Sequence, residues 1–334
     1  MKKGKIKMEN ILEIEDLYVS YKTFGGIARA VNNLNLVVQK GEYLGLVGET
    51  GAGKTTTALS ILKLLPPRTG RINQGKIFFN GVDLTKKSDE YLKKIRGNKI
   101  SMIFQNPLTS LNPVFTIGEQ ISMVFIRHYN LSQKEAWKRA GEMLEVVGIP
   151  SRRSEEYPHQ FSGGMRQRVG IAASLACRPD LLIADEPTTA LDVTIQAQVL
   201  ELLKELKQKY NTALIMISHN LGIIGELCQN VAVMYAGSII ECGSVKQIFR
   251  HPIHPYTKGL FASLPDIYDQ KDRLNAMKGI VSDALNLPEG CQFNPRCPCV
   301  MEKCKLDMPK LIKIQPDHYV ACFQENKLEV KEIE

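Results

Sequence analysis

An eight-residue run, Gly48-Glu49-Thr50-Gly51-Ala52-Gly53-Lys54-Thr55, has the residue types and spacing of a phosphate-binding loop. Its glycines let backbone N–H groups turn inward around phosphate oxygens, and a helix that follows adds the positive end of its dipole. Lys54 would neutralise charge on the β- and γ-phosphates, and Thr55 would supply an oxygen to Mg²⁺, with Thr56 next to it in the same site. The run therefore predicts a site for a nucleoside triphosphate and its magnesium ion.

Two acidic residues follow a second apolar run, Leu181 to Ala184, and provide the carboxylates that such a site needs. Asp185 would hold Mg²⁺ through water. Glu186 projects oppositely and would orient or deprotonate the attacking water. An isolated Asp-Glu pair usually marks only the end of a strand, but the phosphate loop upstream favours the catalytic interpretation.

The elements that must position these groups follow from apolar periodicity. Helix boundaries come from Pro66-Pro67, which stops the helix after the phosphate loop, and from Ser132 to Glu135, a capping box that opens another helix. Two continuous apolar runs flank a segment of helical spacing, which predicts a βαβ unit and a parallel sheet. The expected strands cover about 11–21, 31–38, 42–47, 181–184 and 213–217, and the expected helices about 55–65, 132–147 and 195–210.

Composition limits the classes of protein that remain. The 334 residues carry 43 Lys+Arg and 35 Asp+Glu, a net charge of +8, with 44% hydrophobic residues, which excludes a collagen-like, coiled-coil or disordered chain. The apolar runs are too short to span a bilayer, and the lysines before Asn10 precede no apolar signal region, so no secretion signal is expected. A turn-rich change of composition near residue 250 predicts two domains, 1–250 and 251–334.

The motifs together resemble the ATP-binding cassette (ABC) family. Phe161-Ser162-Gly163-Gly164-Met165-Arg166-Gln167 is similar to its signature motif, Gln105 to its Q-loop, Ala190-Leu191-Asp192 to its D-loop and His219 to its switch histidine. The resemblance implies an α/β fold of the P-loop NTPase type with a RecA-like parallel sheet core. It also implies an N-terminal antiparallel β subdomain, an α-helical signature subdomain at about 106–175 and a small Cys-rich C-terminal domain.

The resemblance also assigns roles to residues. Two cassettes would pair head to tail, so that Ser162, Gly163 and Gly164 of one cap the ATP bound to the other. His219 would contact the γ-phosphate, and Gln105 would reach the metal. Tyr21 is the candidate for stacking on adenine, although a strand tyrosine is more often only packing.

The residues in these motifs are similar to those of the D-type ATPase subunit of dipeptide and oligopeptide importers. The runs that carry this are Ser162 to Arg168, Asp185 to Gln198 and His251-Pro252-Ile253-His254-Pro255-Tyr256-Thr257. The resemblance implies a peripheral ATPase on the cytoplasmic side of the cell membrane, a related second cassette, two membrane permease subunits and, indirectly, an extracytoplasmic solute-binding protein. No nucleic-acid partner is expected, because the acidic residues are scattered among the basic ones.

Two alternatives remain open at this point. Close relatives of the D-type subunit serve nickel or other small solutes. A soluble, non-transport ABC ATPase is disfavoured, because only about a hundred residues separate the phosphate loop from the signature and a single cassette is present.

Five of the eight cysteines lie in the last 44 residues. The absence of an export signal argues against disulfides, and the spacing lacks the short knuckle of a Cys₄ zinc site, whereas thiolates also hold iron–sulfur clusters. The family resemblance implies a 4Fe-4S cluster on Cys291, Cys297, Cys304 and Cys322, with zinc as the alternative metal. Cys299 could replace Cys297, and four free thiols on a flexible tail are the remaining interpretation.

Overall fold

The computed structural model describes residues 9–105, 110–188, 193–263 and 277–324. These residues form two compact units, each built from separated stretches of the chain. The first unit comprises residues 1–12, 37–43 and 78–217, and the second comprises 13–36, 44–77 and 218–334. The D-loop prediction, Ala190 to Asp192, lies outside the described residues.

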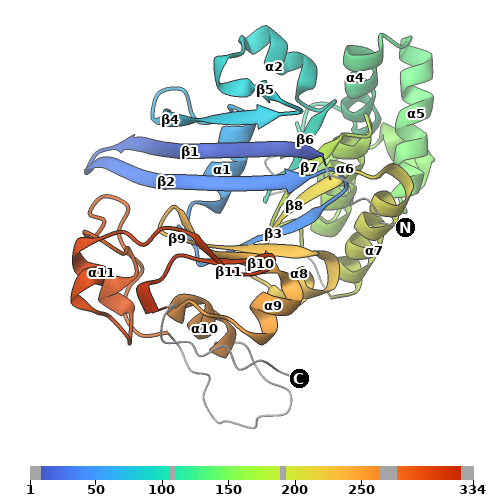
Figure 1. Ribbon diagram of the computed structural model, residues 1–334. Coiled ribbons are helices and arrows are strands. Elements are labelled where there is room, and N and C mark those ends of the chain that lie inside the picture. Colours follow the sequence, from blue (N-terminus) through green and yellow to red (C-terminus); the bar gives the residue numbers. More distant parts are fainter. Residues whose placement is uncertain (1–8, 106–109, 189–192, 264–276, 325–334) are drawn as a thin grey trace, which may run out of the picture. The chain divides into compact units, whose positions relative to one another are not determined.

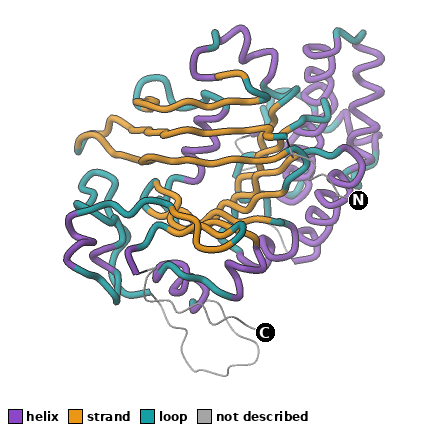
Figure 2. The backbone as a smooth tube through the Cα atoms, viewed as in Figure 1, coloured by secondary structure: helices purple, strands orange, loops and turns teal. Residues whose placement is uncertain are grey.

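A four-stranded sheet opens the chain, in the strand order β2-β1-β4-β5. It consists of β1 (Asn10–Thr23), β2 (Gly26–Gln39), β4 (Gly70–Phe79) and β5 (Val82–Asp83). The two long first strands are joined by a tight turn, as Figure 2 shows. Leu34, Leu36 and Val38 are buried while the residues between them are exposed, which confirms the alternation seen in the sequence.

The first unit contains a parallel sheet portion of three strands, β6 (Ile100–Ile103), β7 (Leu181–Asp185) and β8 (Ala213–Ile217). Every residue of these strands is buried, as continuous apolar runs in a parallel sheet require. The helix α7 (Val193–Tyr210) connects β7 to β8. The predicted βαβ unit and its parallel pairing are therefore confirmed.

The remaining helices of the first unit are α2 (Asp89–Ile95), α4 (Ile117–Tyr129), α5 (Gln133–Val146) and α6 (Gly163–Leu175), with short 3₁₀ turns at Leu84–Lys86, Ser151–Glu155 and Pro158–Gln160. Helices α4 and α5 lie side by side (Figure 1). The predicted capping box of α5 is present, with Ser132 accepting from the backbone N–H of Glu135. Trp137 on this helix is only half-buried and packs beside Gly118.

The second unit contains a sheet portion in the order β3-β9-β10-β12-β11. The strand β3 (Tyr43–Val47) runs parallel to β9 (Asn230–Tyr235) from Leu44 onward. The other pairs are antiparallel and involve β10 (Ser238–Ser244), β12 (His318–Val320) and β11 (Ile312–Gln315). The C-terminal segment thus adds two strands to this sheet, while the domain boundary near residue 250 stays a prediction.

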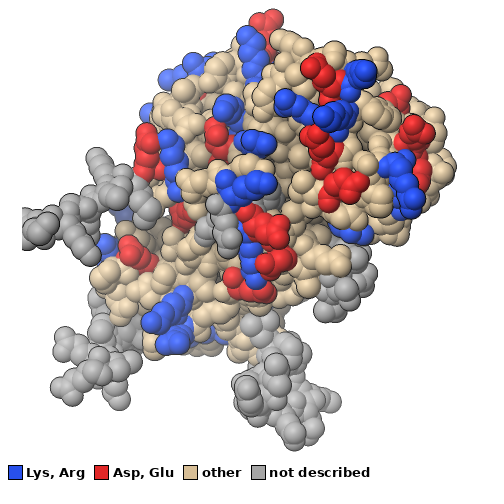
Figure 3. Space-filling view, turned by 90° about the vertical axis from the view of Figure 1, so that its right-hand side faces the viewer, with Lys and Arg blue, Asp and Glu red and all other residues tan. Residues whose placement is uncertain are grey.

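The second unit also holds α1 (Lys54–Ile61), α8 (Leu221–Leu227), α9 (Val245–Arg250), α10 (Pro255–Ala262), a 3₁₀ turn at Asn294–Arg296 and α11 (Glu302–Leu306). No helix among the described residues is long and apolar enough to span a membrane. Acidic and basic side chains are interspersed on the face drawn in Figure 3.

Candidate functional site

The phosphate-binding loop lies between β3 and α1 in the second unit. Gly53 caps α1 at φ 99° and Gly48 has φ 154°. A side chain at Gly48 would collide with the carbonyl oxygen of Met234, and one at Gly53 with that of Ala30. Only glycine fits both positions, so the loop can present its backbone N–H groups at the helix start.

The lysine of the loop is already held in place. Lys54 is buried, and its Nζ donates to the carbonyl oxygens of Gly48 at 2.7 Å and Glu49 at 2.9 Å. Its neighbour Thr55 is exposed at the same helix start, as a ligand for Mg²⁺ would need to be. The Tyr21 hydroxyl donates to Thr56 Oγ1 at 3.3 Å, which places the adenine candidate beside the loop.

The carboxylates lie at the carboxyl end of β7 in the first unit. Asp185 is 2% exposed. Glu186 is bent into the left-handed region at φ 46°, with its N–H donating to the carbonyl of Ile217 at 2.9 Å. A glutamate in this region costs about 1–3 kcal/mol, and such strain is typical of functional sites.

Gln105, the Q-loop candidate, contacts one other predicted site residue within the same unit. Gln105 follows β6, and its Nε2 donates to Glu186 Oε2 at 3.1 Å. Two of the predicted catalytic side chains, 81 residues apart, are therefore brought together.

The signature residues open helix α6. Ser162 is its N-cap and accepts from the N–H of Met165 at 3.4 Å. Ser162 and Gly163 are exposed, and nothing lies within 4 Å of a side chain built at Gly163. The positive end of a 13-residue helix is thus open to an anion.

The predicted groups are divided between the two units. Gln105, the signature residues, Asp185 and Glu186 belong to the first. The phosphate loop, Tyr21 and His219 belong to the second, where His219 is exposed just after β8 ends. Apart from Tyr21, which lies within β1, these groups lie at or just after the carboxyl end of a strand or open a helix, the positions where α/β proteins bind nucleotides.

One small cavity in the second unit is lined by five cysteines: Cys291, Cys297, Cys299, Cys304 and Cys322. Burial raises the pKa of Cys291 to about 11, and the nearby Cys304, Cys297 and Cys322 thiols add to the rise. The backbone N–H of Cys291 donates to the carbonyl of Cys304 at 2.8 Å, so the loop closes on itself. Among the described residues no three metal-binding side chains are already arranged as a site.

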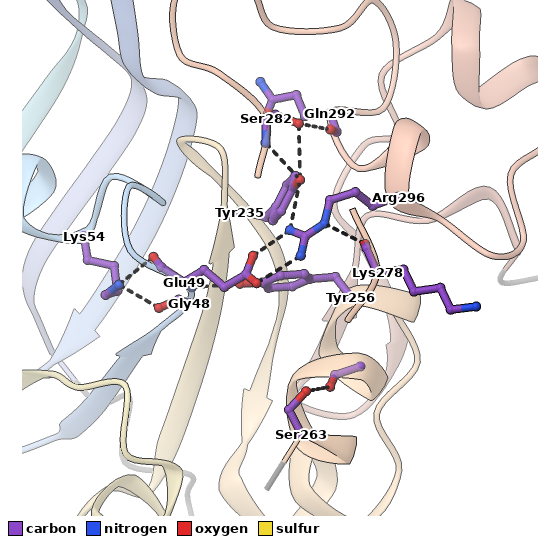
Figure 4. A network of polar contacts seen from close by, with 11 residues as sticks. Gly48, Glu49, Lys54, Tyr235, Tyr256, Ser263, Lys278, Ser282, Gln292 and Arg296 are labelled. Carbon is purple, nitrogen blue, oxygen red and sulfur yellow. Dashed lines mark hydrogen bonds and ion pairs between the residues drawn. The ribbon is translucent and has the colours of Figure 1, made fainter. Parts of the chain in front are cut away.

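Sequence reasoning gave no role to two residues that contact the phosphate loop. Arg296 forms an ion pair with Glu49, and the Tyr256 hydroxyl accepts from the Glu49 backbone N–H at 2.8 Å (Figure 4). Both residues lie in runs that the sequence singles out, since Tyr256 belongs to the His-Pro-rich run and Arg296 directly precedes Cys297. Neither run has a periodicity that points to a contact more than two hundred residues away.

The fold and the phosphate loop define a P-loop nucleotide-binding protein. A family model described as "ABC transporter" matches residues 31–189, and one described as "Oligopeptide/dipeptide transporter, C-terminal region" matches residues 240–304. The chain belongs to the family of ABC transporter ATP-binding proteins, and within it to the oligopeptide and dipeptide group.

Named relatives cover nearly the whole chain. It is 49% identical to the oligopeptide transport ATP-binding protein AppD of Bacillus subtilis, over 95% of this chain and 97% of the relative. The dipeptide transport ATP-binding protein DppD of the same organism is 46% identical, over 96% of each chain.

Solved structures agree with the fold. A dimeric post-hydrolysis structure of the ATP-binding cassette MJ0796, bound to ADP and Pi, has a TM-score of 0.64 and 28% identity, covering 70% of this chain and 98% of that chain. CbiO1 from Clostridium perfringens, part of the transporter complex cbiONQ, has a TM-score of 0.61 and 27% identity, covering 73% of this chain and 92% of that one. The ABC ATPase fold predicted from the sequence is confirmed.

Proposed function

We infer that this chain is the ATP-hydrolysing subunit of an importer that takes up di- and oligopeptides. The observation that carries this is the pairing of a complete phosphate loop with a C-terminal region of the oligopeptide/dipeptide transporter type. The names of the relatives favour peptides over the nickel or small-solute alternative. The same matches favour a transport ATPase over a soluble, non-transport one.

We propose the following roles for the predicted site residues in the binding and hydrolysis of MgATP. Lys54 and the loop N–H groups would hold the β- and γ-phosphates, with Thr55, Asp185 and Gln105 around the metal. Glu186 would accept a proton from the attacking water, and His219 would fix that water and the γ-phosphate. Tyr21, next to Thr56, would stack on adenine.

A second cassette would complete the site. The open start of α6 at Ser162, Gly163 and Gly164 can hold an anion. The phosphates of the chain's own nucleotide are assigned to Lys54 and its loop, so the α6 start is proposed to cap the nucleotide of a partner. The dimeric MJ0796 cassette supports such pairing, and we propose a related cassette as the partner here.

Other partners follow from the transport role. The relatives are named as ATP-binding proteins of peptide transport. We propose that two membrane permease subunits form the pathway, with this chain docked peripherally on the cytoplasmic side. A solute-binding protein would deliver peptide to the permeases, not to this chain.

We propose that Cys291, Cys297, Cys304 and Cys322 hold a 4Fe-4S cluster. The cavity lined by five cysteines supports a thiolate-bound metal, because a bound metal would stabilise the thiolate of Cys291, whose pKa burial raises to about 11. The cluster would order a segment that has little apolar core of its own. Cys299, the exposed member of the set, is the alternative to Cys297, and zinc is the alternative metal.

The catalytic assignment is tested by Glu186→Gln. The amide keeps the size of the side chain but cannot accept the proton, so we expect turnover to fall at least about 100-fold while ATP binding stays within about twofold. The measurements are phosphate release at saturating MgATP and equilibrium binding of a fluorescent ATP analogue. Hydrolysis at the native rate would remove Glu186 from the mechanism.

A further inference from the structure

Arg296 belongs to the segment from Cys291 to Cys304, called the cysteine loop below. Its side chain reaches the phosphate-binding loop. Arg296 Nη1 lies 2.7 Å from Glu49 Oε2, and Nη2 lies 3.1 Å from Glu49 Oε1, so both carboxylate oxygens are held (Figure 4). The Arg296 side chain is 3% exposed and that of Glu49 is 27% exposed. A two-pronged, largely buried pair of this kind is among the stronger polar contacts in proteins.

The surroundings fix the guanidinium in its place. Arg296 Nε donates to the carbonyl of Lys278 at 3.2 Å, and the group lies over the rings of Tyr235 and Phe293 at 5.8 and 5.9 Å. The 3₁₀ turn Asn294–Arg296 sets its backbone directly before Cys297. A guanidinium stays protonated in proteins, so the charge is permanent.

The acceptor of this pair belongs to the loop that must bind polyphosphate. Glu49 follows Gly48, and its carbonyl oxygen accepts from the Lys54 ammonium at 2.9 Å. An unpaired carboxylate at this point would repel phosphate and compete with it for Lys54. The Glu49 carboxylate would therefore weaken phosphate binding unless a positive charge from outside the loop neutralised it.

We propose that Arg296 is a positioning residue for nucleotide binding, which turns the Glu49 carboxylate away from the anion site and neutralises it. The cysteine loop is in this way part of the ATP-binding machinery. The inference rests on the proposed function, because it assumes that the loop binds ATP.

A double-mutant cycle tests the pair in the full-length chain. The measurement is the Kd of a fluorescent, non-hydrolysable ATP analogue with Mg²⁺, for the native chain, Arg296→Gln, Glu49→Gln and the double variant. We expect Arg296→Gln to raise Kd about tenfold or more, since it strands a partly buried carboxylate. The increase in Kd that Arg296→Gln causes should be at least about fivefold smaller when it is made in the Glu49→Gln background, because no carboxylate remains to be stranded.

The effect of Glu49→Gln on the Kd change caused by Arg296→Gln separates this role from simple packing. An Arg296 that served only as structural support would lose affinity equally in the Glu49→Gln background, and that result would overturn the proposal. An unchanged Kd in Arg296→Gln would overturn it as well. Arg250→Gln, an exposed arginine at the end of α9, is the matched control and should bind as the native chain does.

Folding and function can be told apart. If Arg296→Gln does not fold, the cycle is repeated with Arg296→Lys, whose single ammonium cannot grip both oxygens. A rise in Kd of about threefold that Glu49→Gln abolishes is then expected, and equal Kd values for native and Arg296→Lys chains would contradict the proposal. A native chain that binds no analogue would instead refute the proposed function itself.

Discussion

Single glycines show how closely the β3 strand packs where it leads into the phosphate loop. A Cβ at Gly45 would lie 2.5 Å from Ile224 Cγ2 and 3.1 Å from its Cδ1. At Gly170, inside helix α6, the nearest atom to such a Cβ is Ser110 Oγ at 3.9 Å, an ordinary contact. The same substitution should therefore have opposite effects at the two positions.

We predict that Gly45→Ala lowers the free energy of unfolding by about 1–3 kcal/mol, because the strand cannot move away from α8 without loss of packing. Gly170→Ala should raise it by about 0.5–1 kcal/mol, the gain in helix propensity. Urea unfolding of both variants measures the difference. A Gly45→Ala chain as stable as the native one would show that the β3–α8 contact is loose.

Single residues also show where sequence reasoning reaches its limit. The phosphate loop could be found from its own eight residues, because glycines, lysine and threonine there act on a ligand through local backbone geometry. The Arg296–Glu49 pair joins residues 247 apart in the chain, and no local propensity encodes it. The left-handed backbone of Glu186 was equally hidden, since nothing in an Asp-Glu pair requires a positive φ.

At the level of elements, the buried strands followed the sequence closely. The expected strand at 213–217 coincides with β8, and that at 181–184 extends by one residue to Asp185 in β7. Continuous apolar runs of this length leave a chain few other ways to bury them. The return of β12 to pair with β10 was not foreseen, because its three residues carry too little pattern.

The iron–sulfur cluster proposed for the cysteine loop can be tested by metal analysis. We predict about four iron and four sulfide per chain after anaerobic purification. Cys304→Ser, which replaces the most buried thiol of the five, should lose the iron, and Cys177→Ser, a buried cysteine of the first unit, should keep it.

The two remaining ligand assignments can be separated in the same assay. Cys297→Ser should lose the iron and Cys299→Ser should retain it. The reverse result would exchange the two ligands. A native chain that contains zinc and no iron would replace the cluster with the alternative metal.

On the scale of the whole molecule, the described surface leaves the signature helix start open while the phosphate loop is already closed around Lys54. In the proposed scheme, the phosphate loop of one chain binds a nucleotide, and the start of α6 in the other unit covers the nucleotide that a partner cassette binds. A pair of cassettes would therefore use both features. Sequence motifs could suggest this arrangement, but which partner is chosen depends on surfaces that carry no local signal.

The most direct test is phosphate release per chain as the full-length protein is diluted, measured alongside its sedimentation and its binding of the non-hydrolysable ATP analogue. We predict that turnover per chain falls toward zero as the protein becomes a monomer, and that Ser162→Arg abolishes turnover while analogue binding stays within about twofold. The account would be contradicted if the protein, at concentrations where it sediments as a monomer, hydrolysed ATP at an unchanged rate per chain in both the native form and Ser162→Arg.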